Sequence, residues 1–393
     1  MAIIRKKNIV LRKNEEHRVQ AGHQWVFSNE VHAINGAPKS GDIVEIFRHD
    51  MKRIGIGFYN PHSLIAARFL SFEDEEIDFK FFEQRIGSAL ALRKKLYPKA
   101  SAFRLVNGES DFLPGLIIDK YNEYLSVQTF SAGMDLRLTL ICDVLVSLFS
   151  PRGIVERNES PLRSLEELPI RKGVIRGTVE PTIIELHDLK FRVDLLEGQK
   201  TGFFLDQREN RASLRPFAKD ANVLDCFCNE GGFGLYAAHF GAQCVKGIDI
   251  SEFAIEKSNV NATLNSLHTI KFNCADVFTV LGEEVVAKAR YDLVILDPPS
   301  FTKNKKTVAT AVKGYKEINT SAMKLLANGG ILATASCSHH IADETFLNIV
   351  NDSAVKAGRK ARLLRFGGAA PDHPTLPAMP ETKYLKFALL SVE

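Results

Sequence analysis

YDLVILDPPSF (residues 291–301) is the stretch that decides the fold, together with ILATASCS (residues 331–338). Each contains a short apolar run, Leu293–Leu296 or Ile331–Thr334, which is typical of a strand buried in a parallel sheet. The runs are followed by reactive groups, Asp297 and Cys337. Ligands of open α/β sheets bind outside the carboxyl ends of the strands, so we expect this carboxylate and this thiol to share one site.

The surrounding sequence predicts a doubly wound sheet. From about residue 186 the chain alternates strand, loop and helix, which is the pattern of a Rossmann-like α/β domain. The stretch ANVLDCFCNEGGFGLYAAHFGA (residues 221–242) is an apolar strand, then a glycine loop, then a helix. Glycines let the backbone approach a ligand closely, and the helix N-terminus offers free N–H groups.

Three acids follow three successive strands of this half. Asp225 precedes the glycine loop, and Asp249, followed by Ile250, ends the next strand. An acid in the position of Asp249 accepts hydrogen bonds from the ribose hydroxyls of a nucleoside cofactor. Asp276 is placed to bind an adenine amino group while Val277 packs on the ring. The alternative for each acid is to cap the helix that follows it.

The glycine loop leaves two cofactors open. Residues 232–237, GFGLYA, satisfy the G-x-G-x-x-G/A fingerprint of dinucleotide-binding proteins, which would suit NAD. Asp225 would repel a pyrophosphate, however, whereas it can hold the ammonium group of S-adenosylmethionine. The sequence therefore favours S-adenosylmethionine.

The segment after Leu296 predicts chemistry on a nucleic-acid base. The Asp297-Pro298-Pro299 turn is rigid, because proline fixes φ, and it would hold the carboxylate of Asp297 toward a base amino group. Phe301 is placed to stack on that base. A thiolate at Cys337 that adds to carbon 6 of cytosine would make carbon 5 nucleophilic. A thiol of pKa ~8.5 needs help from its site to ionise, and an inert buried cysteine is the alternative.

Composition and charge agree with an RNA-binding enzyme. The chain has 393 residues, of which 45% are hydrophobic and 25% charged, and a net charge of +4. Residues 1–70 hold eleven Lys and Arg against six Asp and Glu, so the remaining chain carries −1. This asymmetry predicts a basic N-terminal module that docks RNA. Six cysteines without a C-x-x-C pair predict no metal site, and the lack of a signal-peptide or membrane-spanning run predicts a cytoplasmic protein with no membrane partner.

The pattern along the chain predicts three domains. Residues 1–70 read as short strands and turns of a small β-barrel. Residues 71–185 read as an α+β domain, with one helix that stops before Pro98 and another around 133–149. Residues 186–393 form the α/β domain.

Several motifs together resemble the RlmI-like class I methyltransferases, a family that includes the enzyme making 5-methylcytosine in large-subunit ribosomal RNA. The resemblance covers nearly the whole chain. It is carried by GQKTGFFLDQRENR (198–211), LDCFCNEGGFGLYAA (224–238), LDPPSF (296–301), KGYKEIN (313–319), SCS (336–338) and DHP…YLK (372–386). GHQWVFSNEV (22–31) with GDIVEI (41–46) resembles the family's N-terminal PUA domain, a small RNA-binding β-barrel.

The resemblance implies a three-domain S-adenosylmethionine-dependent RNA methyltransferase, with ribosomal RNA as partner and a homodimer as assembly. It implies Cys337 as the nucleophile. It also implies a cofactor site formed by Gln207, Asp225, Asn229, Gly231, Gly232, Asp249 and Asp276. The chain departs from the family pattern at Gln24, at Asn229-Glu230 and at Ser300.

Three alternatives stay open on the sequence. The first is a methyltransferase for guanine N7 or another nucleobase, with a non-catalytic Cys337. The second is an NAD-linked oxidoreductase. The third is a non-catalytic RNA-binding protein built on the PUA-like module.

Overall fold

The computed structural model describes residues 7–302 and 304–393 of the chain. The first six residues of the predicted N-terminal domain and Lys303 therefore lie outside the described residues. The chain forms two compact units. The first holds the described residues up to Ile184 together with Val193–Leu205 and Pro371–Thr382, and the second holds Glu185–Arg192, Asp206–Ala370 and Lys383–Glu393.

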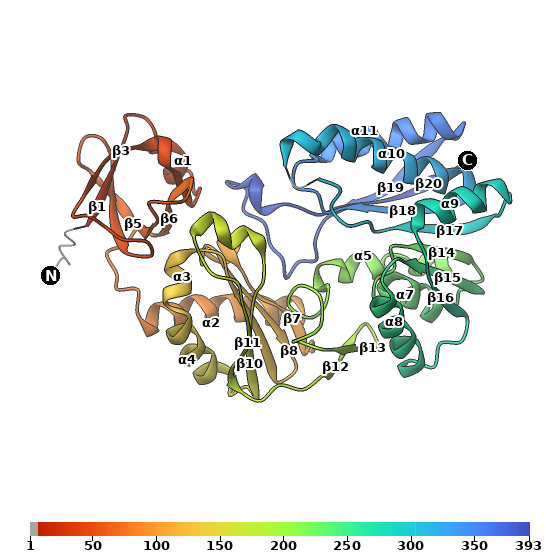
Figure 1. Cartoon of the computed structure of the whole chain (residues 1–393), viewed down its shortest axis with the longest axis horizontal. Coiled ribbons are helices and arrows are strands. Elements are labelled where there is room, and N and C mark those ends of the chain that lie inside the picture. Colours follow the sequence, from red (N-terminus) through yellow and green to blue (C-terminus); the bar gives the residue numbers. More distant parts are fainter. Residues whose placement is uncertain (1–6, 303) are drawn as a thin grey trace. The chain divides into compact units, whose positions relative to one another are not determined.

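The first unit begins with a β domain whose six strands lie in the order β2-β6-β5-β4-β1-β3 (Figure 1). Side chains such as Ile9, Val44 and Ile46 fill its core, and the predicted small domain of short strands is confirmed. Its elements are β1 (Asn8–Leu11), α1 (His17–Gln20), β2 (Trp25–Phe27), η1 (Ser28–Glu30), β3 (Val31–Asn35), β4 (Ile43–Phe47), β5 (Arg53–Tyr59) and β6 (Ile65–Ser71).

The rest of the first unit is an α+β structure with a five-stranded sheet in the order β11-β10-β9-β8-β7. Helices α2 and α4 contribute Phe82, Ile86, Ile141 and Leu145 to its core. The elements are α2 (Phe79–Leu96), β7 (Ala102–Asn107), η2 (Gly108–Asp111), β8 (Leu116–Tyr121), β9 (Tyr124–Thr129), α3 (Ala132–Leu136), α4 (Leu138–Phe149), β10 (Gly153–Asn158), η3 (Pro161–Glu166) and β11 (Arg171–Gly177).

The helices of this part agree with the sequence pattern in one case and differ from it in another. Helix α2 begins where the Asp78 carboxylate accepts the Phe81 N–H, and it ends before Pro98 as predicted. The single helix predicted around 133–149 is two helices that meet at Arg137. The Arg137 N–H donates to the Met134 carbonyl, three residues back, and the Gly133 carbonyl accepts from the Arg137 guanidinium instead of from its N–H. The series of α-helical hydrogen bonds is therefore interrupted at Arg137.

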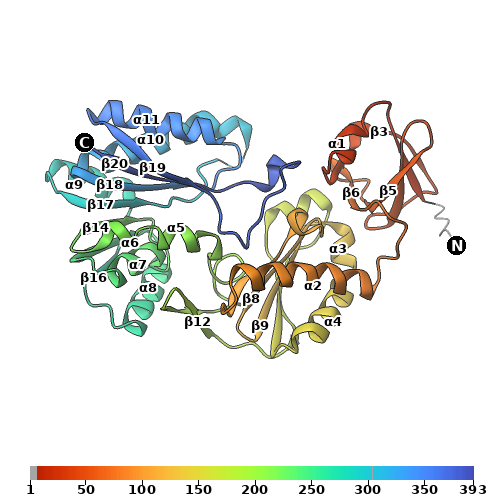
Figure 2. The same cartoon turned by 180° about the vertical axis from the view of Figure 1, so that it is seen from behind.

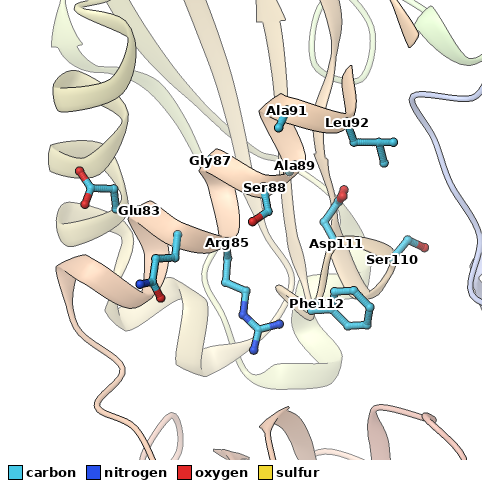
Figure 3. A pocket seen from close by; sticks show the side chains of 11 residues that line it. Glu83, Arg85, Gly87, Ser88, Ala89, Ala91, Leu92, Ser110, Asp111 and Phe112 are labelled. Atoms are coloured by element: carbon cyan, nitrogen blue, oxygen red, sulfur yellow. The ribbon is translucent and has the colours of Figure 1, made fainter. Parts of the chain in front are cut away.

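A hollow of about 810 Å³ lies between α2 and residues 110–112 (Figure 3). Arg85, Ser88 and Phe112 are among the residues that line it, and the guanidinium of Arg85 lies 5.8 Å from the centroid of the Phe112 ring. The predicted site residues all lie in the second unit, so this hollow contains none of them.

Two sets of buried contacts hold the first unit together. The Arg68 guanidinium joins the β domain to the α+β part through Glu109 (3.1 Å) and Glu166 (3.0 Å). The segment Pro371–Thr382 is held by Asp372, whose carbonyl oxygen accepts from the Arg93 guanidinium (2.8 Å) and whose carboxylate accepts the Arg104 N–H (3.0 Å). Residues close to the C-terminus are therefore part of the first unit.

The second unit is built on a seven-stranded sheet in the order β16-β15-β14-β17-β18-β20-β19. Strands β14, β15, β16, β17 and β18 run parallel to one another, and β20 is antiparallel to both β18 and β19. The strands are β14 (Asn222–Cys226), β15 (Cys244–Asp249), β16 (Ile270–Cys274), β17 (Tyr291–Leu296), β18 (Leu326–Ser336), β19 (Ala361–Gly367) and β20 (Lys386–Val392). The α-helices are α5 (Arg208–Ala212), α6 (Arg215–Ala218), α7 (Gly232–His239), α8 (Glu252–Leu264), α9 (Val277–Val286), α10 (Val308–Leu325) and α11 (Asp343–Ala357).

Five short elements complete the chain. A two-stranded sheet is formed by β12 (Thr182–Leu186) and β13 (Leu189–Val193), and the 3-10 turns are η4 (Leu205–Gln207), η5 (Lys305–Thr307) and η6 (Pro380–Thr382). The predicted boundaries at residues 70 and 185 stay predictions.

The seven-stranded sheet has helices on both faces. Figures 1 and 2 show α7 and α8 on one face and α10 and α11 on the other, which confirms the predicted doubly wound fold. The strand order runs outward in opposite directions from the β14–β17 pair, so this pair is the topological switch point where such sheets bind ligands. Cys226 pairs with Leu296, and Leu296 pairs with Thr334, so β14, β17 and β18 end side by side.

Candidate active site

The loop after β14 requires glycine for steric reasons. Gly231 has a φ of 82°, and a Cβ there would lie 2.8 Å from the Phe272 ring. A Cβ on Gly232 would lie 2.7 Å from Nε of Arg211, and one on Gly234 would lie 2.9 Å from Oδ2 of Asp225. The predicted strand–loop–helix passage is therefore present, and its backbone passes unusually close to charged side chains.

Asp225 is fully buried beneath this loop. Its Oδ2 accepts the Gly234 N–H at 2.7 Å, while its Oδ1 has no hydrogen-bond donor within the described part of the chain. Burial raises the pKa of Asp225 to about 8, and the nearby charge of Asp297 acts in the same direction. A buried oxygen without a donor is costly. The site therefore fits a cationic N–H donor such as the ammonium group of S-adenosylmethionine.

Asp249 ends β15, and its two oxygens bond two different segments, the glycine loop and the start of α8. Oδ2 accepts the Asn229 N–H at 2.9 Å and Oδ1 accepts the Ser251 N–H at 3.0 Å. Each carboxylate oxygen has a further lone pair, so these bonds leave room for ribose hydroxyls. The adjacent Ile250 side chain is 72% exposed, as a surface that receives a ligand would be.

Asp276 is the N-cap of helix α9, which is the alternative role that the sequence allowed for it. Its Oδ1 accepts the N–H and the hydroxyl of Thr279 at 2.8 and 2.9 Å, so it caps helix α9. The Val277 side chain is 2% exposed and belongs to the apolar core of the sheet. The predicted contacts of both residues with an adenine ring stay predictions.

Gln207 and Asp297 are in direct contact. The Gln207 amide donates to Oδ1 of Asp297 at 2.9 Å, and its own oxygen accepts from the Asn210 amide at 2.7 Å. The Asp297 carboxylate is therefore oriented by a buried chain of amides. The sequence assigned Gln207 to the cofactor and Asp297 to the base, and the structure places the two at one point.

Cys337 lies beside the Asp-Pro-Pro turn, as the strand pattern predicted. It follows the last residue of β18, is half-buried, and its thiol donates a weak hydrogen bond to the Pro298 carbonyl at 3.9 Å. The carboxyl ends of β17 and β18 thus bring a carboxylate turn and a thiol to the same edge of the sheet.

A network of hydroxyl groups ties these two segments together, and sequence reasoning missed it. The Ser336 hydroxyl donates to the Tyr315 hydroxyl at 3.0 Å, and Tyr315 is hydrogen-bonded to Ser338 at 2.9 Å. Ser338 is in turn 3.0 Å from the hydroxyl of Ser300. Ser300, a departure from the family pattern, is therefore part of the site's support. The KGYKEIN motif, which contains Tyr315, was the available signal.

Phe301 lies within an aromatic cluster. Its ring centroid is 4.6 Å from that of Tyr315, 6.0 Å from Phe278 and 6.4 Å from Phe227. The ring is partly buried, and its stacking on a base stays a prediction.

Two buried cations were also missed. Arg211 lies beneath the glycine loop, with its guanidinium 5.7 Å from the centroid of the Phe233 ring. Burial lowers the pKa of Arg211, and the charges of Asp297 and Asp225 oppose that shift. Lys386, at the start of β20, pairs with Ser336, the residue before Cys337. The motifs DQRENR, which ends in Arg211, and YLK, which ends in Lys386, were the sequence signals that could have identified these two cations.

Neither a cluster of metal-binding side chains nor a membrane-spanning helix is found among the described residues. Residues 7–302 and 304–393 contain no group of three or more His, Cys, Asp or Glu side chains arranged to hold a metal ion. No helix within these ranges is both long enough and apolar enough to span a bilayer.

Comparison with known proteins gives agreement over nearly the whole chain. A family model described as an S-adenosylmethionine-dependent methyltransferase matches residues 177–390, and a model described as a PUA-like domain matches residues 9–72. The chain is 41% identical over 386 residues to ribosomal RNA large subunit methyltransferase I of Tolumonas auensis, covering 96% of this chain and 97% of that protein. The protein of the same name from Vibrio cholerae is 39% identical with the same coverage.

Solved structures agree with the fold. A protein from Streptococcus mutans, assigned as a SAM-dependent methyltransferase, superposes with a TM-score of 0.84 at 19% identity, over 98% of this chain and 99% of its own. A second structure, solved in complex with S-adenosylhomocysteine, gives a TM-score of 0.85 at 19% identity with the same coverage. This chain therefore belongs to the ribosomal RNA large subunit methyltransferase I family of S-adenosylmethionine-dependent methyltransferases, with a PUA-like domain in its N-terminal part.

Proposed function

We propose that this protein makes 5-methylcytosine in large-subunit ribosomal RNA through a covalent adduct of Cys337. The observation that carries the proposal is the contact between the two chemical segments, in which the Cys337 thiol lies 3.9 Å from the Pro298 carbonyl at the carboxyl edge of the sheet. The name shared by the relatives from Tolumonas auensis and Vibrio cholerae supports the RNA substrate.

Residues of the second unit are proposed to hold the cofactor. Asp225 would receive its ammonium group at the orphaned Oδ1, and Asp249 its ribose. Asn229, Gly231 and Gly232 would let the backbone approach it, and further contacts come from Gln207, Ile250, Asp276 and Val277. When bound, S-adenosylmethionine supplies an electrophilic methyl group.

The remaining chemistry belongs to the base and to this chain. The Cys337 thiolate adds to carbon 6 of cytosine, and ring nitrogen 3 takes up a proton with support from the Asp297 carboxylate. Carbon 5 is then an enamine carbon able to accept the methyl group. Loss of the proton from carbon 5 to a base and departure of the thiolate from carbon 6, with release of the nitrogen 3 proton to solvent, restore the neutral aromatic ring. Pro298 keeps the turn rigid and Phe301 contacts the base.

RNA docking is proposed for the PUA-like domain. The excess of positive charge in residues 1–70 supports it, because phosphate contacts supply much of the affinity of RNA-binding proteins. A homodimer follows from the family resemblance and is part of the proposal.

Covalent trapping tests the nucleophile. RNA that carries 5-fluorocytosine should form a stable adduct with the wild type, because fluorine cannot leave carbon 5 as a proton. Cys337→Ala should abolish methyl transfer and trapping while cofactor affinity is kept, and Cys337→Ser should be nearly as inactive. Cys244→Ala, at an exposed cysteine that begins β15, is the matched control. Near-normal turnover of Cys337→Ala would instead support methylation of guanine N7 or another nucleobase.

A further inference from the structure

Lys386 is a buried lysine whose ammonium contacts the backbone of the segment that contains Cys337. It is the first residue of β20 and pairs with Ser336, the last residue of β18, one position before Cys337. Only 3% of Lys386 is exposed. Its ammonium donates to the carbonyl oxygen of Ser338 at 2.6 Å and to that of Tyr384 at 2.7 Å. The lysine thus holds the residue that follows Cys337.

The charges around this ammonium are few. Among the described residues, Lys386 forms no ion pair with a carboxylate, and Asp343 is paired with Lys383 instead. Burial lowers the pKa of Lys386 to about 8. The charge of Cys337 is the strongest of the effects that raise this pKa; Asp343 also raises it, and Lys383 lowers it. Cys337 is therefore the principal group able to supply the missing negative charge.

The other titratable neighbours do not supply that charge. The pKa of His339 is lowered by burial and by the charges of Lys386 and His340, so the imidazole adds little positive charge near the thiol. The pKa of Tyr315 is raised, chiefly by burial, so its hydroxyl stays protonated. The buried ammonium of Lys386 and the thiolate of Cys337, which follows the adjacent strand, are therefore expected to stabilise each other's charge.

We propose that Lys386 is a positioning residue that fixes the 337–338 turn and stabilises the thiolate of Cys337. A cation beside a cysteine favours the thiolate, and the proton that leaves the sulfur passes to solvent. Only the catalytic use of this thiolate rests on the proposed function. The interaction between the two groups exists without RNA and can be measured without it.

The first measurement is the pH dependence of Cys337 alkylation by iodoacetamide, followed by mass spectrometry of the peptide that contains it. Lys386→Met should move the profile upward by about one pH unit, which slows alkylation near neutral pH by about tenfold. Lys386→Arg keeps the charge and should recover most of the reactivity. Lys246→Met, which removes a partly buried lysine paired with Glu284 elsewhere in the sheet, should leave the profile unchanged.

The second measurement uses the reciprocal effect and does not depend on the Lys386 variants folding. Cys337→Ala removes the thiolate, so the pKa of Lys386, read from competitive acetylation at different pH values, should fall. An unchanged alkylation profile in Lys386→Met, or, if that variant does not fold, an unchanged Lys386 profile in Cys337→Ala, overturns the proposal. Loss of the cytosine adduct chemistry alone would overturn only the proposed function, because neither measurement contains RNA.

Discussion

Asp225 shows how burial sets the chemistry of a single side chain. Its pKa rises to about 8 in the folded protein, whereas an aspartate in an unfolded chain titrates near ~3.9. Between these values the unfolded chain ionises while the folded protein keeps its proton. The folded state therefore binds more protons in this window, and its stability falls as pH rises through it. The binding site is maintained at a cost to the stability of the free protein.

Asp225→Asn should remove this titration. We expect the variant to gain stability relative to the wild type as pH rises from 5 to 8, by ~3–4 kcal/mol, because only the wild type has a carboxyl group to ionise. The same variant should bind S-adenosylmethionine more weakly, since the amide carries no charge. Thermal unfolding without cofactor and titration calorimetry would measure the two effects. Parallel stability profiles for the two proteins would contradict the assignment.

The site residues differ in how far the sequence alone could predict them. Asp297 and Cys337 follow apolar strands, so a local pattern was enough to place them at one edge. Asp276 satisfied two interpretations, because an acid after a strand is also an acid before a helix; the bond to Thr279 shows the helix cap, and the adenine contact stays a prediction. Lys386 and Tyr315 reach the site through pairings distant in sequence, which no local pattern encodes.

At the scale of elements, the turn from β14 into α7 is the part most constrained by backbone geometry. Gly231 has a left-handed φ and lies against Phe272 of β16, so the loop is fixed from two directions. The strand–loop–helix pattern predicted that glycines were needed here. It did not predict the closeness of Arg211 and Phe272, because those contacts depend on how neighbouring elements pack.

Gly231→Ala should therefore damage both stability and cofactor binding. The left-handed backbone costs a residue with a Cβ ~1–2 kcal/mol, and displacement of the Phe272 ring adds to it. Gly282→Ala is the matched control, because its Cβ would meet no atom within 4 Å and it lies in helix α9. The control should gain ~0.5–1 kcal/mol from helix propensity. Urea unfolding and cofactor titration of both variants would measure this, and equal behaviour would be evidence against a rigid loop.

At the scale of the whole molecule, the β domain cannot be treated as a detachable module. Removing it would leave Glu109 and Glu166 without Arg68, and a buried charge that loses its partner is strongly destabilising. The charge asymmetry along the chain predicted an N-terminal RNA-docking part, but not these pairs. Its contribution to RNA binding is better tested by surface substitutions.

Replacing four exposed cations of the β domain with glutamine should weaken RNA binding and reduce its salt dependence. Each lost phosphate contact lowers the slope of log affinity against log salt by ~0.7–0.9. The substituted residues are Arg12, Lys13, Lys39 and Lys52. The control carries the same change at four exposed lysines of the second unit, Lys288, Lys324, Lys356 and Lys360. Filter binding to a large-subunit ribosomal RNA transcript would measure both, and an equal loss of slope would refute docking by the β domain.

The placement of Pro371–Thr382 in the first unit has a consequence for synthesis on the ribosome. The chain emerges from its N-terminus, yet buried Arg93 can meet Asp372, which lies 279 positions later, only after the residues between them have been translated. Strand β20 then enters between β18 and β19, which were made before it. Both units thus await the same final segment. We expect a nascent chain to remain incomplete in both units until residues 371–392 have been made, so a stop codon placed before Pro371 would leave both units without this segment.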